Sequence, residues 1–74
     1  MTEIDLHGYT HDDAKQNLEN ELIVQYNNNK FPVLIITGNS FKMKSIVYEV
    51  GKELNFTVTP PLDNNIGALV VKRL

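Results

Sequence analysis

The sequence predicts a small α/β domain, more narrowly an α+β two-layer sandwich with a four-stranded mixed sheet and both helices on one face. The first observation is the order of patterns along the chain, which is β-α-β-α-β-β without a repeat, linker or low-complexity segment. The second is that strand-helix-strand units imply parallel neighbours joined by right-handed crossovers. Two crossovers in one direction leave both helices on one face of the sheet, with the last strand antiparallel to the others. We expect one domain over residues 1–74.

The first half of the chain predicts one strand and one helix. Residues 2–7 alternate apolar and polar side chains, which is typical of a strand, and Gly8 breaks the pattern. Thr10 is the expected N-cap of the helix, because two aspartates in the following turn place negative charge at the positive end of the helix dipole. The helix is expected to end near Tyr26. Its apolar stripe consists of Ala14, Leu18, Leu22 and Tyr26.

The second half predicts a buried strand, a helix and two further strands. Residues 33–37 form a continuous β-branched and apolar run, which favours a central strand over an edge strand. The second helix is expected from about Phe41, with Ser40 as its cap. Residues 55–59 and 68–72 supply the last two strands. The apolar positions of the second helix are Met43, Ile46, Val47, Val50 and Leu54, and Tyr48 is expected in the core with them.

The composition excludes several classes of protein. No apolar run approaches the ~20 residues that span a bilayer, and no leader precedes the first strand, so we expect a cytoplasmic protein with no membrane partner. The chain has no cysteine and therefore neither a disulfide nor a thiolate metal site. No metal and no other cofactor is expected, because the remaining ligand types are poorly spaced. These are Asp5, His7, His11, Asp12 and Asp13.

The charge balance bears on binding partners. The formal net charge of -2 argues against tight non-specific binding to nucleic acid, which usually needs a basic domain. Lys42 with Lys44, and Lys72 with Arg73, nevertheless allow a local basic edge.

The first strand carries a candidate catalytic pair. Side chains two apart on a strand point the same way, so Asp5 and His7 face away from the helices if Ile4 and Leu6 face them. A carboxylate beside an imidazole can orient it for proton transfer, and the carboxyl end of a parallel strand is where open α/β sheets bind ligands. The alternative is that both side chains are simply solvated on an edge strand.

The turn between the second strand and the second helix is a candidate phosphate site. Thr37, Gly38, Asn39 and Ser40 lead into the free N–H groups of a helix start, which suit an anion. Lys42 and Lys44 would add positive charge, and Gly8 lies in the neighbouring turn. The alternative is an ordinary turn in which Ser40 only caps the helix. Two aromatic residues near the helix starts, Tyr9 and Phe41, either stack on unpaired bases or pack against the chain as hydrophobic staples.

Four short motifs in one order resemble the Smr (small MutS-related) domain family over nearly the whole chain. Residues 4–8, Ile-Asp-Leu-His-Gly, are similar to the family's Leu-Asp-x-His motif with its following Gly, and Ala14, Leu18 and Leu22 fall where its first helix is apolar. Residues 35–38, Ile-Ile-Thr-Gly, resemble the strand that leads into its Thr-Gly-x-Gly loop. Residues 67–71 resemble its last strand.

The resemblance implies a fold similar to the C-terminal domain of bacterial translation initiation factor three. It also implies binding of structured RNA or branched DNA and, in many members, endonuclease activity. Asp5 and His7 would be the catalytic pair, and the binding residues would be Gly8, Thr37, Gly38, Asn39, Ser40, Lys42 and Lys44.

Ser40 is a departure from the family, whose second loop glycine would stand in its place. A serine does not readily take positive φ, and its Cβ keeps a phosphate from the closest approach to the backbone. Its hydroxyl can instead donate a hydrogen bond to a phosphate. The alternative to an endonuclease is therefore a non-catalytic module of the same fold that binds nucleic acid or a protein partner. As to oligomeric state, we expect a monomer or a weak homodimer.

Overall fold

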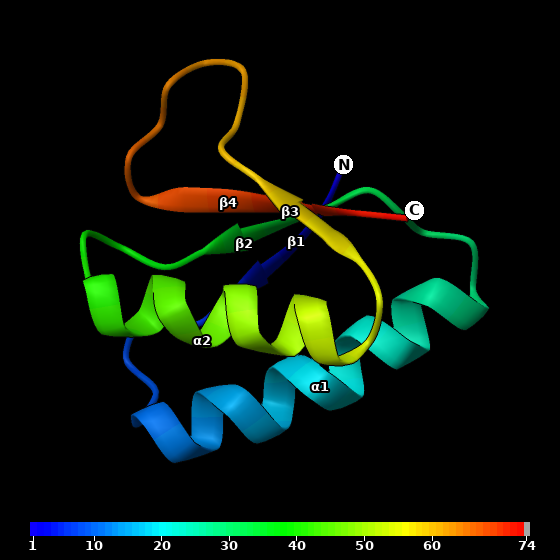
Figure 1. Ribbon diagram of the computed structural model, residues 1–74, viewed down its shortest axis with the longest axis horizontal. Coiled ribbons are helices and arrows are strands. Elements are labelled where there is room, and N and C mark those ends of the chain that lie inside the picture. The colour runs from blue at the N-terminus through cyan, green and yellow to red at the C-terminus, as the bar shows by residue number, and fades with distance from the viewer. Residues whose placement is uncertain (74) are drawn as a thin grey trace.

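The computed structural model describes residues 1–73 and has the predicted order of elements. Two helices lie on one side of a four-stranded sheet, as Figure 1 shows. The chain runs through β1 (Thr2–Asp5), α1 (His11–Asn27), β2 (Val33–Ile36), α2 (Phe41–Glu53), β3 (Thr57–Thr59) and β4 (Ala68–Lys72). The α+β two-layer sandwich predicted from the sequence is therefore confirmed.

The sheet has the strand order β1-β2-β4-β3. β1 pairs with β2 in parallel, and β4 lies antiparallel to both β2 and β3. The register sets Asp5 beside Ile36, and Ile36 beside Ala68. The ends of β1 and β2 and the beginning of β4 consequently share one edge of the sheet, at the left in Figure 1.

The core lies between the sheet and the two helices. In β1, β2 and β4, alternate residues face the helices and their neighbours face the opposite side of the sheet, where Ala68 and Val70 of β4 are also buried. Ile4 and Leu6 belong to the core, as the strand pattern predicted. The other core residues are Ala14, Leu18, Leu22, Val33, Ile35, Met43, Ile46, Val47, Val50, Leu69 and Val71.

Both helices begin and end as their terminal residues dictate. The Thr10 hydroxyl accepts a hydrogen bond from the Asp13 N–H at 3.2 Å, and the Ser40 hydroxyl accepts one from the Met43 N–H at 3.0 Å. Each helix is followed by an asparagine in the left-handed region, Asn29 at φ 57° and Asn55 at φ 63°. Asparagine tolerates this conformation better than most residues, and it lets the next N–H bond back to the last turn.

The structure corrects four details of the sequence prediction. β2 ends at Ile36 rather than residue 37, since the Thr37 N–H donates to Gly67, which precedes β4. β1 ends at Asp5 rather than residue 7, because the Asp5 side chain binds the main chain of His7 and starts a turn. β3 begins at Thr57 rather than residue 55, because Asn55 closes α2. The prediction that Tyr48 lies in the core is wrong, since 45% of its surface is exposed.

Candidate functional site

Two strand-to-helix turns lie side by side at one edge of the sheet. The first follows β1 and leads into α1, and the second follows β2 and leads into α2 (Figure 1). Beyond the paired strands, the Leu6 N–H still donates to the Ile36 carbonyl at 2.9 Å. This contact extends the parallel pairing to the beginning of both turns. It places the segment containing His7 and Gly8 next to the segment containing Gly38, as the sequence predicted.

The first turn is closed by its own residues. The Asp5 Oδ1 accepts a hydrogen bond from the His7 main-chain N–H at 2.8 Å, and the Tyr9 N–H donates to the Leu6 carbonyl at 3.2 Å. Gly8 has φ 91°, which a residue with a side chain rarely adopts. The role that the structure gives Asp5 is therefore to hold the backbone of His7, whose side chain is exposed at this edge. The catalytic roles of Asp5 and His7 stay predictions.

The second turn is held by a different part of the chain. The N–H groups of Thr37 and Gly38 both donate to the Gly67 carbonyl, at 2.9 and 3.0 Å. Thr37 is only 3% exposed, and its hydroxyl donates to the Gly38 carbonyl at 2.8 Å. Thr37 thus acts by shaping the turn from inside. Thr37 was predicted as a binding residue, but with so little exposed surface it can affect binding only through the shape of the turn. Asn39, in contrast, lies exposed at the surface.

Ser40 has an extended backbone, with φ -78° and ψ 116°. The conformation therefore needs no glycine at this position, which removes the conformational objection raised by the family's loop glycine. Its hydroxyl oxygen accepts from the Met43 N–H, so the cap predicted from the sequence is confirmed. The hydroxyl proton is still available to a ligand, because the capping bond uses only the oxygen as an acceptor.

The loop before β4 supports the second turn, a role that was not predicted from the sequence. The Asp63 carboxylate accepts from the Asn65 N–H at 3.1 Å, and the Asn65 side-chain oxygen accepts from the Gly67 N–H at 2.9 Å. The Lys44 ammonium donates to the Ile66 carbonyl. The signal in the sequence was the run of Asp and Asn, residue types that bind the main chain two positions further on.

The charges at the two helix starts have opposite sign. α1 has Asp12 and Asp13 in its first turn, whereas α2 has no acidic residue there and carries Lys42 and Lys44. Because a helix start is electropositive, the aspartates of α1 already neutralise it, and the lysines of α2 reinforce it. An anion is therefore better placed at α2 than at α1.

The resolved pKa shifts lie on the seam between the helices rather than at the turns. A hydrogen bond with Glu49, whose carboxylate lies 2.9 Å from the ammonium, raises the pKa of Lys15. A hydrogen bond with Glu53 raises the pKa of Glu19. Both groups lie on the surface, where solvent screens the interaction. They belong to the packing of α1 against α2.

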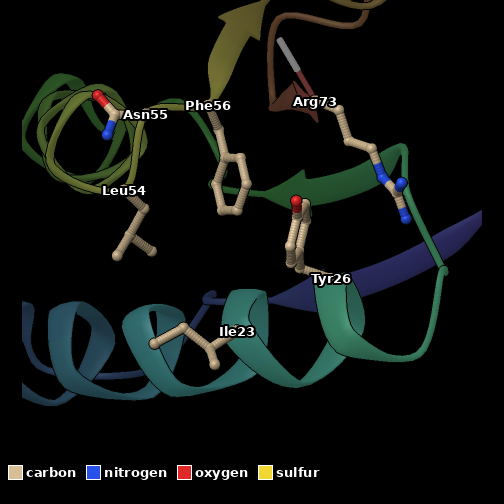
Figure 2. Close-up of a pocket in the computed structure, with 6 residues that line it drawn as sticks. All are labelled: Ile23, Tyr26, Leu54, Asn55, Phe56 and Arg73. Atoms are coloured by element: carbon tan, nitrogen blue, oxygen red, sulfur yellow. The ribbon is translucent and has the colours of Figure 1, made fainter.

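A cavity of about 570 Å³ lies at the opposite end of the molecule, and Figure 2 shows its lining. Tyr26 from α1 and Phe56 from the segment before β3 project into it, with ring centroids 5.5 Å apart, and Arg73 lies over the Tyr26 ring at 4.9 Å. The Arg73 guanidinium also donates to the Asn29 side chain at 2.7 Å. These contacts join the end of β4 to the end of α1, so we assign them to the fold.

Within residues 1–73, no three carboxylate or imidazole groups gather in a way that could hold a metal ion. None of the helices described here is both long and apolar enough to cross a membrane.

Comparison with known proteins gives one match. No curated protein and no solved structure matches the chain. The family model of the Smr domain matches residues 4–72, which include the end of β1, both turns and β4. That span covers nearly all of the 74 residues. The chain therefore belongs to the Smr domain family.

Proposed function

We propose that this domain binds nucleic acid, structured RNA or branched DNA, through the edge formed by its two strand-to-helix turns. The observation that carries the proposal is the adjacency of these turns, since the Leu6 N–H donates to the Ile36 carbonyl at 2.9 Å. One turn presents the exposed His7, and the other presents a helix start reinforced by Lys42. Membership of the Smr family is consistent with a nucleic-acid-binding module.

The start of α2 supplies the phosphate contact in this proposal. The Ser40 oxygen atoms take the N–H groups of Met43 and Lys44, so those donors are occupied. The preceding N–H groups, of Phe41 and Lys42, belong to the first turn and have no carbonyl partner within a helix. Together with the Lys42 ammonium they form a donor set suited to a phosphate. At the start of α1, the carboxylates of Asp12 and Asp13 stand in place of such a positive charge.

RNA cleavage through His7 is the second candidate function. It is favoured by the exposed imidazole, which stands on a backbone held by Asp5 beside the proposed phosphate site. The imidazole would take the proton of an RNA 2′-hydroxyl as its oxygen attacks the adjacent phosphorus. The bond from phosphorus to the 5′ oxygen breaks, and that oxygen takes up a proton from solvent. The products are a 2′,3′-cyclic phosphate and a 5′-hydroxyl end, so the reaction needs no metal.

Binding and cleavage are tested together on hairpin RNA and on four-way branched DNA, with and without chelator. We expect salt-sensitive binding by the wild-type chain, and Lys42→Glu should weaken it. If the second function holds, chelator leaves RNA cleavage intact, and His7→Ala lowers its rate by about 10²-fold or more while binding is retained. Undiminished cleavage by His7→Ala would remove the role of His7. Binding without any cleavage would identify a non-catalytic module, and no binding at low salt would overturn the proposal.

A further inference from the structure

One exposed face of α2 alternates aromatic and basic side chains. Phe41, Lys44, Tyr48 and Lys52 follow one another at intervals of three or four residues, so they share a side of the helix. We call these four residues the outer face of α2. Phe41 is 87% exposed and Tyr48 is 45% exposed. The staple alternative for Phe41 is therefore wrong, because a ring so exposed does not pack against the chain.

The acidic residues of α2 lie on another side of the helix. α2 contains two carboxylates, Glu49 and Glu53, and both interact with side chains of α1. Glu49 pairs with Lys15, and Glu53 lies near enough to Glu19 to raise its pKa. The third side of the helix, which includes Met43 and Val47, is buried in the core. The outer face is consequently positive and aromatic along the described length of α2.

The outer face borders a groove that the loop before β4 completes. The groove has a volume of about 310 Å³, and its lining includes Lys44, Tyr48, Pro60, Asn64, Asn65 and Ile66. The Lys44 ammonium donates to the Ile66 carbonyl, which holds the loop against the helix. The two asparagine amides offer both donors and acceptors, the functional groups that match the edges of nucleic acid bases.

We propose that the outer face of α2 binds a single-stranded segment of nucleic acid that adjoins the phosphate at the start of α2. Bases stack on Phe41 and Tyr48, whose Cα atoms lie about 10 Å apart along the helix axis at 1.5 Å per residue. Lys44 and Lys52 contact the phosphates between and beyond them. Alternation of rings with ammonium groups, without a carboxylate, is how sequence-tolerant single-strand sites are built. The proposal rests on the proposed function and assigns its substrate as a junction between structured and unpaired strands.

The test compares one RNA hairpin with a blunt end and the same hairpin with a single-stranded extension of about eight nucleotides, within the range covered by small single-strand sites. Fluorescence anisotropy at low salt should show tighter binding of the extended hairpin. Phe41→Leu should lose about tenfold in affinity for it, whereas Phe41→Trp should keep the affinity, because any aromatic ring offers a face for stacking. Tyr48→Leu, which changes a residue outside the phosphate site, should bind the blunt hairpin as the wild type does. Since Phe41 is exposed, neither Phe41 variant should lose its fold, and thermal unfolding confirms this.

Further variants probe the rest of the face and provide matched controls. Tyr48→Leu should weaken binding of the extended hairpin as Phe41→Leu does. Lys52→Ala should make that binding less salt-dependent, so that the slope of log affinity against log salt concentration becomes shallower by about 0.7. Val24→Ala and Lys30→Ala remove an exposed apolar group and an exposed charge outside α2, and should leave the extension's effect unchanged. Equal affinities for both hairpins, with Phe41→Leu and Phe41→Trp indistinguishable, would overturn this inference and leave the proposed function standing. Failure to bind either hairpin would overturn both.

Discussion

The two strand-to-helix turns share several backbone features and have opposite side-chain charges. Each follows one of two adjacent parallel strands, contains a glycine at positive φ, and ends in a hydroxyl cap, Thr10 or Ser40. The first then places Asp12 and Asp13 at the helix start, and the second places Lys42 and Lys44 there. Two turns with similar features can therefore differ in their attraction for anions, because the side chains of the first helical turn set the local charge.

The turns also differ in what holds them. Asp5 closes the first turn locally, through the N–H of His7 two residues away. The second turn is held by the Gly67 carbonyl, from the other end of the chain. A local turn can form early and independently, whereas the second turn needs β4 and its loop in place. The shape of the proposed phosphate site thus depends on the completed sheet.

The largest expected effect comes from reversing the charge that distinguishes the turns. Lys42→Glu should weaken hairpin RNA binding roughly tenfold at low salt, because it removes one phosphate contact and adds a repulsion. Asp12→Lys should strengthen binding, since it opens the start of α1 to anions. Anisotropy titrations over several salt concentrations measure both. If both substitutions had the same effect, the two helix starts would not differ as described.

The turn glycines should respond alike in stability. Gly8 has φ 91° and Gly38 has φ 65°, and an added Cβ would meet nothing within 4 Å at either position. Gly8→Ala and Gly38→Ala should each lower the free energy of unfolding by about 1–2 kcal/mol, from backbone strain alone. Urea unfolding gives both values. A much larger loss at Gly38 would show that strain there also breaks the contact with Gly67.

The helix caps should contribute a little less. Thr10→Ala and Ser40→Ala should each cost about 1 kcal/mol of stability, because each leaves the N–H of the third following residue without its partner. Ser40→Gly, which restores the residue typical of the family's loop, should cost only a few tenths of a kcal/mol. Thermal unfolding compares the three variants. A Ser40→Gly protein destabilised as much as Ser40→Ala would mean that Ser40 does more than cap α2.

The smallest effect lies outside both turns, at the seam between the helices. A hydrogen bond with Glu53 raises the pKa of Glu19, so the folded state holds this proton more tightly than the unfolded state. The resulting stabilisation is fully present below the ordinary pKa of a glutamate and is lost as the pH rises through the raised value. Glu19→Gln should flatten this dependence in unfolding midpoints measured from mildly acidic to neutral pH. Nucleic acid binding should not change, because the seam is separate from the turns.

Several features of the fold and the site could be read from local patterns. The alternation around Ile4 and Leu6 identified both core residues, and the positions of Thr10 and Ser40 identified both caps. These predictions succeed because a strand has a period of two and a cap acts over three residues. The prediction for Tyr48 failed because burial depends on segments that are distant in the chain. Its position next to an apolar stripe does not show which side of α2 other elements cover.

The sequence by itself determined the order of elements, the helix ends, the Smr membership and the opposite charges that follow the two turns. Each of these can be recognised from short segments of the chain and from their order. The tertiary structure alone decided that Gly67 holds the Gly38 turn, that Lys44 ties the loop before β4 to α2, and that Phe41 and Tyr48 stay exposed. The physical reason is that burial and long-range hydrogen bonds depend on which segments meet in space, and that is settled only when β4 inserts between β2 and β3.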